Sequence, residues 1–129
     1  MEHSRHYTLE QAQAVRGWVA ARVRVVRRAQ TTLHELGPRA KAGLDALSPE
    51  GGGAWPGRDV ARPLVELSRA VAELEAVEIV VRDVERGLID FPAIRDGHEV
   101  YLCWLLDDEG EIGFWHGIED GFAGRRPLP

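Results

Sequence analysis

A long apolar stripe between Thr8 and Gly37 restricts the folds open to this chain more than any other feature. That stripe predicts an amphipathic helix with a narrow seam, because its apolar residues recur at alternating steps of three and four. Thr8 and Gln11 have the spacing of a capping box at the helix start, and Gly37 followed by Pro38 ends the pattern. Arg22 alone interrupts the stripe, whose members are Ala12, Val15, Val19, Val26, Ala29, Leu33 and Leu36.

A second helix with a matching seam is predicted from about Pro63 to Val77. Opposite charges on the two helices favour an antiparallel, coiled-coil-like hairpin. Residues 48–58 between them are rich in Gly and Pro, so we expect a flexible connection, preceded by a short helix near residues 40–47. The second seam consists of Leu64, Leu67, Val71 and Leu74, and the facing charges are Arg16, Arg24, Arg27 and Arg28 against Glu66, Glu73, Glu75 and Glu78.

From residue 78 onward the pattern becomes that of a small antiparallel β-sheet. Pro92 is expected to end the second strand, and a compact turn at residues 107–110 joins the last two strands into a hairpin. The predicted strands cover residues 79–81, 88–91, 98–106 and 111–116. The fold class is therefore α+β, in a single domain of residues 1–129, with the helical hairpin at about 8–77 and the β module at about 78–129.

The hairpin register determines which side chains share a face of this sheet. With Glu109 at the turn centre, one face is predicted to carry Val100, Leu102, Trp104, Leu106, Ile112, Phe114 and His116, and the other Tyr101, Cys103, Leu105 and Trp115. Both faces are apolar and need a cover. Either the helices cover one face and a second copy the other, which favours a homodimer, or the C-terminal tail folds back.

Charge and cysteine content narrow the partners and the compartment. The formal net charge of −5 argues against nucleic-acid binding, which requires a basic face. A single cysteine excludes an internal disulfide and a zinc cluster built from cysteines alone, and favours a reducing cytoplasm. No stretch approaches the ~20 apolar residues of a membrane span.

His116 is the first candidate site residue, because an imidazole at a strand end followed by Glu119 and Asp120 could bind a divalent metal or carry a proton. A buried histidine that is satisfied by a backbone carbonyl would explain the same residues.

Asp90 is the second candidate, because a carboxylate inside the apolar strand LIDFP needs a partner. Arg125 or Arg126 could supply it, and these arginines together with Gly124 could form an anion-binding corner. The alternative for both is a structural ion pair. Glu99, near a strand start, is expected to be hydrated.

The sequence pattern does not favour a catalytic role for the remaining reactive side chains, Cys103, His3 and His6. Cys103 lies among apolar strand residues, where burial raises the pKa of a thiol, so a nucleophile is not expected. His3 and His6 form an H-x-x-H pair on a terminus expected to be frayed, which favours adventitious metal binding. The chain contains no nucleophile elbow, H-E-x-x-H pair, dinucleotide-binding turn or Walker loop.

Four tracts of this chain resemble an uncharacterised bacterial family catalogued as domain of unknown function 2203: YTLEQAQAV, DVERGLIDFPA, GHEVYLCWLL and IGFWHGIEDGFAGRRPL. The chain has Gly117 where members of that family often have Glu, and Arg126 where they often have Gln. The resemblance implies a small bacterial cytoplasmic protein with no assigned activity.

Two functions are therefore expected from the sequence. The first is a non-catalytic binding or protein-interaction module that engages a partner or a second copy through its helical seams. The second is a ligand-binding protein or enzyme that depends on a metal or an anion, with a divalent metal as possible cofactor and Asp90, His116, Glu119 and Arg125 as its site.

Overall fold

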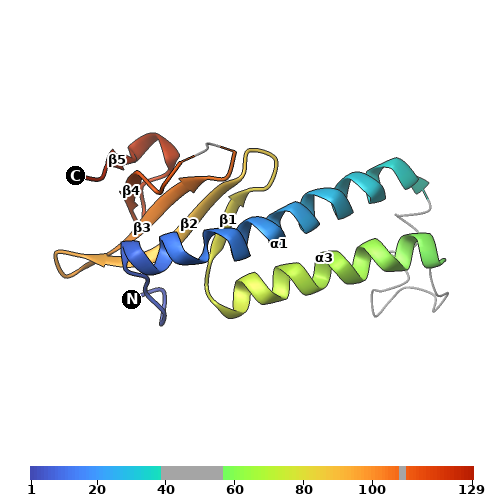
Figure 1. The fold of residues 1–129 in the computed structure, drawn as a ribbon, viewed down its shortest axis with the longest axis horizontal. Helices are drawn as coiled ribbons and strands as arrows, with labels where there is room; N and C mark the ends of the chain where they lie inside the picture. Colours follow the sequence, from blue (N-terminus) through green and yellow to red (C-terminus); the bar gives the residue numbers. More distant parts are fainter. Residues whose placement is uncertain (39–56, 108–109) are drawn as a thin grey trace.

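The computed structural model describes residues 1–38, 57–107 and 110–129 of the chain. Figure 1 shows two helices side by side, with one end of the pair against a sheet. The elements are α1 (Leu9–Leu36), α3 (Arg58–Ala76), β1 (Val80–Asp83), β2 (Leu88–Arg95), β3 (His98–Leu105), β4 (Phe114–Gly117), the 3-10 turn η1 (Phe122–Gly124) and β5 (Arg126–Pro127). This arrangement confirms the predicted α+β class. The predicted short helix lies outside the described residues. The predicted flexible connection also lies outside them, except for residues 57 and 58.

Local hydrogen bonds determine where the two helices begin. Thr8 Oγ1 accepts a hydrogen bond from the Gln11 backbone N–H at 3.0 Å, and Gln11 Oε1 accepts from the Thr8 N–H at 2.9 Å, so the predicted capping box is confirmed. α3 begins at Arg58, five residues before the predicted Pro63. The Gly57 carbonyl accepts the first bonds of that helix, and Pro63, buried in its second turn, removes one bond without ending it.

Arg22, which interrupts the apolar stripe of α1, links the two helices. Its Nε donates to Glu73 on α3 at 2.7 Å, and its guanidinium lies 3.8 Å from the Trp18 ring centroid. The seams pack inside the chain, where Val19 and Val23 are fully buried. None of the four arginines predicted to flank the hairpin forms an ion pair with a predicted glutamate in the described part of the chain, and Arg27 instead donates to the loop before β2 and to Asp107.

The five strands form one antiparallel sheet in the order β1-β2-β3-β4-β5. β2 continues through Pro92, so the prediction that this proline ends the strand was wrong. Pro92 lies beyond the end of β1, and its carbonyl accepts from the Tyr7 N–H at 2.7 Å. No strand needs a donor from Pro92 at that position, which is why the proline is tolerated.

The β3–β4 register differs by one residue from the predicted one. Tyr101 pairs with His116 and Cys103 with Phe114, so these four side chains share a face. The predicted grouping of His116 with Leu102 and Trp104 was therefore wrong, because a one-residue slip moves every side chain of a strand to the other face.

α1 covers one face of the sheet, and the C-terminal segment 118–125 lies on the other (Figure 1). Both seams and both faces are thus in contact with other parts of the chain, and a homodimer is not supported. Neither α1 nor α3 combines the length and apolarity that crossing a bilayer requires. The α1-facing core includes Ala12, Val19, Val23, Ile89, Phe91, Ala93, Val100, Leu102 and Trp104.

Candidate functional site

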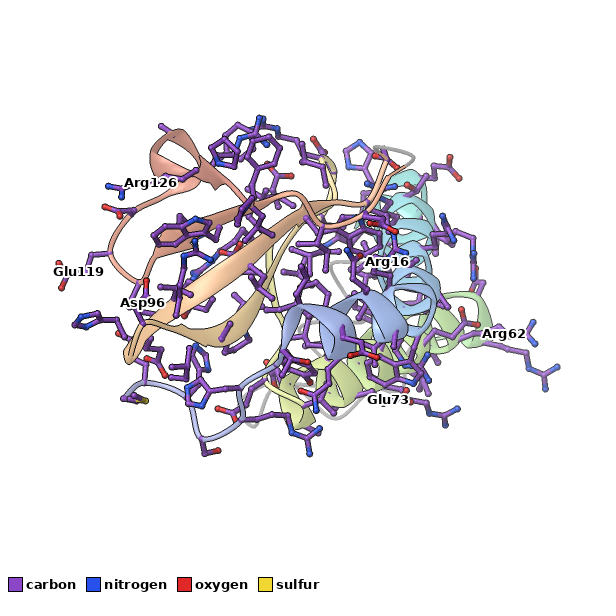
Figure 2. All side chains as sticks on the ribbon, turned by 60° about the vertical axis from the view of Figure 1, so that its left-hand side comes forward. Arg16, Arg62, Glu73, Asp96, Glu119 and Arg126 are labelled. Carbon is purple, nitrogen blue, oxygen red and sulfur yellow. The ribbon has the colours of Figure 1, made fainter. Side chains whose placement is uncertain are left out.

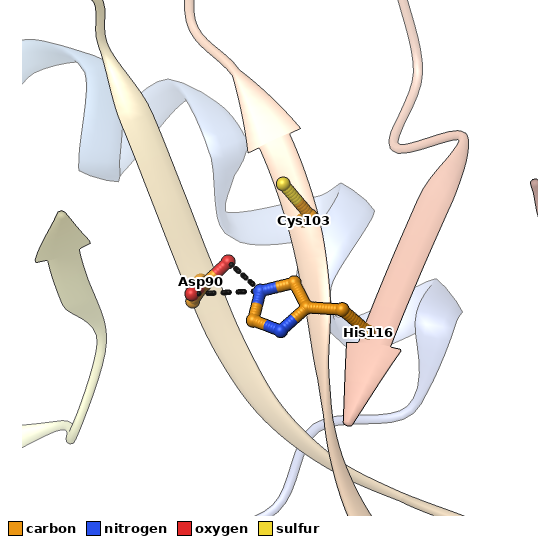
Figure 3. Close-up of side chains that lie close together, drawn as sticks. All are labelled: Asp90, Cys103 and His116. Carbon is orange, nitrogen blue, oxygen red and sulfur yellow. Dashed lines mark hydrogen bonds and ion pairs between the residues drawn. The ribbon is translucent and has the colours of Figure 1, made fainter. Parts of the chain in front are cut away.

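Three reactive side chains from neighbouring strands meet on the sheet face opposite α1 (Figure 3). They are Asp90 on β2, Cys103 on β3 and His116 on β4, and they are 1%, 2% and 3% exposed. Their candidate ligand atoms all lie within 4.8 Å of one another. We call these three residues the Asp-Cys-His cluster. A carboxylate, a thiol and an imidazole buried together form a donor set that suits a transition metal.

The hydrogen bonds of His116 leave the lone pair of its Nε2 atom directed at the two carboxylate oxygens of Asp90. His116 Nδ1 lies 2.9 Å from the Gly117 carbonyl, which can only accept, so Nδ1 carries a proton. Nε2 of the same ring lies 3.0 Å from both carboxylate oxygens of Asp90. In a neutral ring Nε2 would be an acceptor facing the two oxygens, so this contact requires either a proton shared between the ring and the carboxyl group or a metal ion.

Arg82 is the arginine that pairs with Asp90, and the prediction that Arg125 or Arg126 does so was wrong. Its Nε donates to Asp90 Oδ2 at 2.9 Å. Burial lowers the pKa of the guanidinium, but the hydrogen bond and charge of Asp90 raise it more, so the net pKa is raised. Arg82 is the extra residue of a β-bulge between Val81 and Asp83, a feature that the sequence pattern does not reveal.

Cys103 is the site residue that sequence reasoning assigned to the core alone. Burial, followed by the negative charge of Asp90, raises the pKa of its thiol to about 12. The group is therefore protonated at neutral pH, as predicted. The missed signal is the Asp96-Gly97 turn, whose two positive φ angles build a tight hairpin that sets Asp90 opposite Cys103.

A pocket of about 290 Å³ adjoins the cluster and contains all three predicted metal ligands in its wall. Glu119 and Asp120 line it with exposed carboxylates, together with Arg82, Asp90 and His116. Figure 2 shows Glu119 directed outward at the end of the molecule far from the helices. The structure thus brings Asp90 and His116 into contact and leaves Glu119 and Asp120 at the rim.

The two predicted anion-binding arginines lie on aromatic rings. The Arg125 guanidinium is 4.2 Å from the Phe114 centroid and 4.0 Å from that of Phe122. Arg126 lies 5.5 Å from the Trp115 centroid and also points outward in Figure 2. Neither forms an ion pair with a carboxylate in the described part of the chain.

The N-terminal segment is held by two carboxylates, so the expectations of a frayed terminus and a hydrated Glu99 were wrong. Glu99, with its side chain 7% exposed, accepts from His6 at 2.7 Å and from the backbone N–H groups of Glu2 and His3. The hydrogen bond from His6 is the largest cause that lowers the pKa of Glu99 to about 2.

This segment also reaches the neighbourhood of the cluster. His3 Nε2 lies 2.6 Å from the Tyr101 hydroxyl, and its Nδ1 lies 3.3 Å from Glu78. The Tyr101 ring contacts the His116 ring at a centroid distance of 5.4 Å. A chain of polar contacts therefore runs from the terminus to Tyr101, and the ring contact joins it to the cluster.

Comparison with known proteins places the chain in a family. The model of a family described as an uncharacterized conserved protein (DUF2203) matches residues 5–128, which include the whole Asp-Cys-His cluster. No curated protein and no solved structure shows a significant match. The match covers almost the full chain, including all four resembling tracts, and so the chain belongs to the DUF2203 family.

Proposed function

We propose that this protein binds a divalent transition metal, with Zn²⁺ as the best-matched ion, through Asp90, Cys103 and His116. The observation that carries the proposal is the contact between His116 Nε2 and both Asp90 oxygens at 3.0 Å, while Nδ1 is engaged by Gly117. A metal ion would accept the Nε2 lone pair and both anionic ligands at once. The prediction of a metal- or anion-dependent site is thus kept, with Cys103 in place of Glu119 and Asp120 as ligand.

A second ring proton would also resolve the contact, and the net charge of the buried groups would then equal that of a site holding Zn²⁺ and a Cys103 thiolate. Asp90 is already neutralised by Arg82, so an imidazolium would bury a second cation against a single carboxylate. A metal ion would add the Cys103 thiolate as a second anion, so its charge would be shared by two anionic ligands, Asp90 and Cys103.

Small shifts would convert the cluster into a metal site. Zinc bonds of about 2.0–2.3 Å at tetrahedral angles place ligand atoms roughly 3.3–3.6 Å apart. The nitrogen and oxygens would separate slightly from 3.0 Å, and the widest of the ligand-atom separations, all within 4.8 Å, would close by at most about 1.5 Å. Side-chain rotation alone can supply such changes.

The surroundings of the cluster support the ligand roles. The Gly117 carbonyl fixes the His116 tautomer so that Nε2 faces the ion, and Arg82 orients the Asp90 carboxylate through Oδ2. Three protein ligands leave a fourth position open, which is typical of catalytic zinc sites. The adjoining pocket offers room for a water molecule or a small substrate there.

The first expected function, interaction through the helical seams, has less support. The seams pack against each other and the sheet along most of their length, and Val71 is the one exposed residue of the second seam. A cytoplasmic setting remains part of our proposal, because a reducing compartment keeps a single thiol available as a ligand.

Zinc titration of the untagged, full-length protein by calorimetry tests this proposal. We expect one Zn²⁺ per chain, and affinity losses of about 100-fold or more for Cys103→Ser, Asp90→Asn and His116→Gln. His98→Gln is the matched control, because His98 is an exposed histidine at the far end of the β2–β3 hairpin. Circular dichroism checks that each variant folds.

Cobalt provides a second readout that does not depend on affinity. Co²⁺ bound by the wild type should show a thiolate-to-cobalt charge-transfer band, and Cys103→Ser should lack it. The proposal is overturned if zinc binding survives His116→Gln but is lost in His3→Gln, or if the cobalt complex shows no thiolate band.

A further inference from the structure

A second and larger cavity lies between α1, α3 and β1, and we call it the helix groove. Its volume is about 730 Å³, within the range of roughly 300–1,000 Å³ that is typical of small-molecule sites. No residue of the Asp-Cys-His cluster lines it, so the two sites have separate walls. Most of its wall is apolar and comes from Val23, Val26, Leu67, Val71, Leu74, Ile79, Val80, Val81 and Val84.

The polar part of the groove wall is acidic. Glu2, Glu75 and Glu78 line it together with His3 and Gln30, and no lysine or arginine does so among the described residues. Glu78 is already bonded by Ser4 and the Arg5 N–H. The exposed carboxylates of Glu2 and Glu75 have no ion-pair partner in the described ranges.

The position of Glu75 makes its charge unfavourable. α3 ends at Ala76, and its last turn contains no basic residue. A helix C-terminus carries partial negative charge, so an unpaired carboxylate there is repelled, whereas a cation would be attracted. Glu73 in the same turn is neutralised by Arg22, which leaves Glu75 as the unpaired acid.

We propose that the helix groove binds an amphiphilic small molecule with an apolar chain and a cationic head group. The apolar wall takes the chain, and Glu75 and Glu2 take the head. From Leu67 to Glu75 the groove follows α3 for about 12 Å, since a helix rises about 1.5 Å per residue. That length suits an alkyl chain of moderate size in an extended form.

Paired amphiphiles test the charge argument. We expect decyltrimethylammonium, titrated calorimetrically below its micelle concentration, to bind with one-to-one stoichiometry and at least about tenfold more tightly than decanoate. Shortening the chain should weaken binding about fourfold per methylene removed. Glu75→Gln should reduce the preference for the cation, and Glu66→Gln, on α3 but outside the groove, should leave it unchanged.

Two matched valine variants test the location. Val71→Arg places a cation in the groove wall and should abolish binding, whereas Val65→Arg on the same helix should have no effect. Val71 and Val65 are 38% and 51% exposed, so neither substitution disturbs the core. Cys103→Ser should bind the amphiphile normally, which separates this proposal from the metal site.

Three results would overturn the inference. The first is binding of decanoate as tight as that of the cationic probe. The second is an equal loss of binding in both valine variants, which would indicate non-specific detergent uptake. The third is a dimer in sedimentation that Val71→Arg dissociates, because the groove would then be covered by a second copy of the chain.

Discussion

Asp90 stands directly opposite Cys103 across the β2–β3 pair. The carboxylate and the thiol are therefore held together by the longest strand pair of the sheet, and both are buried. The negative charge of Asp90 adds to burial in raising the pKa of the Cys103 thiol. Any metal that enters the cluster must displace that thiol proton.

Zinc binding should accordingly release at least about one proton per ion at neutral pH. Because the pKa of the Cys103 thiol is raised to about 12, the thiolate fraction and hence the zinc affinity should rise about tenfold per pH unit between pH 6 and 8. Calorimetry in two buffers of different ionisation enthalpy measures the proton count. The count should fall by about one in Cys103→Ser, and binding without proton release would contradict the proposed thiolate ligand.

Asp90→Ala and Asp90→Asn should differ sharply in the stability of the metal-free protein. The alanine leaves Arg82 and His116 unpaired and should cost about 2–3 kcal/mol, since Arg82 is partly exposed and can rehydrate. An asparagine amide can donate to His116 Nε2 while its oxygen accepts from Arg82, so that variant should lose about 1 kcal/mol or less.

Urea unfolding in the presence of a chelator measures both Asp90 variants. Asp96→Asn is the control, because this exposed turn residue has φ of 52°, which asparagine tolerates, and its stability should change by less than about 0.5 kcal/mol. Equal losses for the two Asp90 variants would show that the charge itself, rather than the hydrogen-bond pattern, stabilises the cluster.

Acid should release the N-terminal segment through Glu99. The hydrogen bond from His6 is the main cause that lowers the pKa of Glu99 from 4.5 to about 2 in the folded protein. A depressed folded-state pKa contributes stability that is fully present above about 4.5 and is lost as pH falls towards 2. Thermal unfolding between pH 2 and 6 measures this loss. The melting temperature of the wild type should exceed that of Glu99→Gln at pH 6, and the difference should shrink as the pH falls towards 2.

The exposed Glu111 supplies the comparison for that experiment. Glu111→Gln should follow the wild-type melting curve at every pH. If Glu99→Gln also follows it, the contacts of Glu99 with residues 2–6 do not contribute to stability.

Two glycine substitutions should change stability in opposite directions. A Cβ at Gly87 would lie 2.6 Å from the Leu106 Cβ, and φ there is 68°, so Gly87→Ala should cost about 2–3 kcal/mol. Gly17 lies on the exposed side of α1, and no atom lies within 4 Å of the position that an alanine Cβ would take there, so Gly17→Ala should add about 0.5–1 kcal/mol. Melting temperatures of the two variants should therefore lie on opposite sides of the wild type.

The start of α1 and the composition of the core could be read from the sequence because their causes are local. Thr8 and Gln11 satisfy each other within one turn, and the apolar stripe has a helical period whatever it packs against. Asp90 and His116 were recognised for a related reason, since a polar residue in an apolar strand needs a partner wherever the strand lies.

The partners of those two residues depended on the tertiary structure. The β3–β4 connection is held by α1, where Gln13 Oε1 accepts from the Ile112 N–H and Arg16 donates to the Gly110 carbonyl. These distant contacts accompany a register that differs by one residue from that of a simple hairpin turn. His116 thereby lies on the face of Cys103 and Asp90.

The sequence by itself thus determined the fold class, the helix start and the need of Asp90 and His116 for partners, since each follows from residues close together in the chain. Only the tertiary structure decided that Arg82 and Cys103 join them. The physical reason is that side chains alternate between the faces of a strand, so a shift of one residue in the pairing of two strands decides which groups meet.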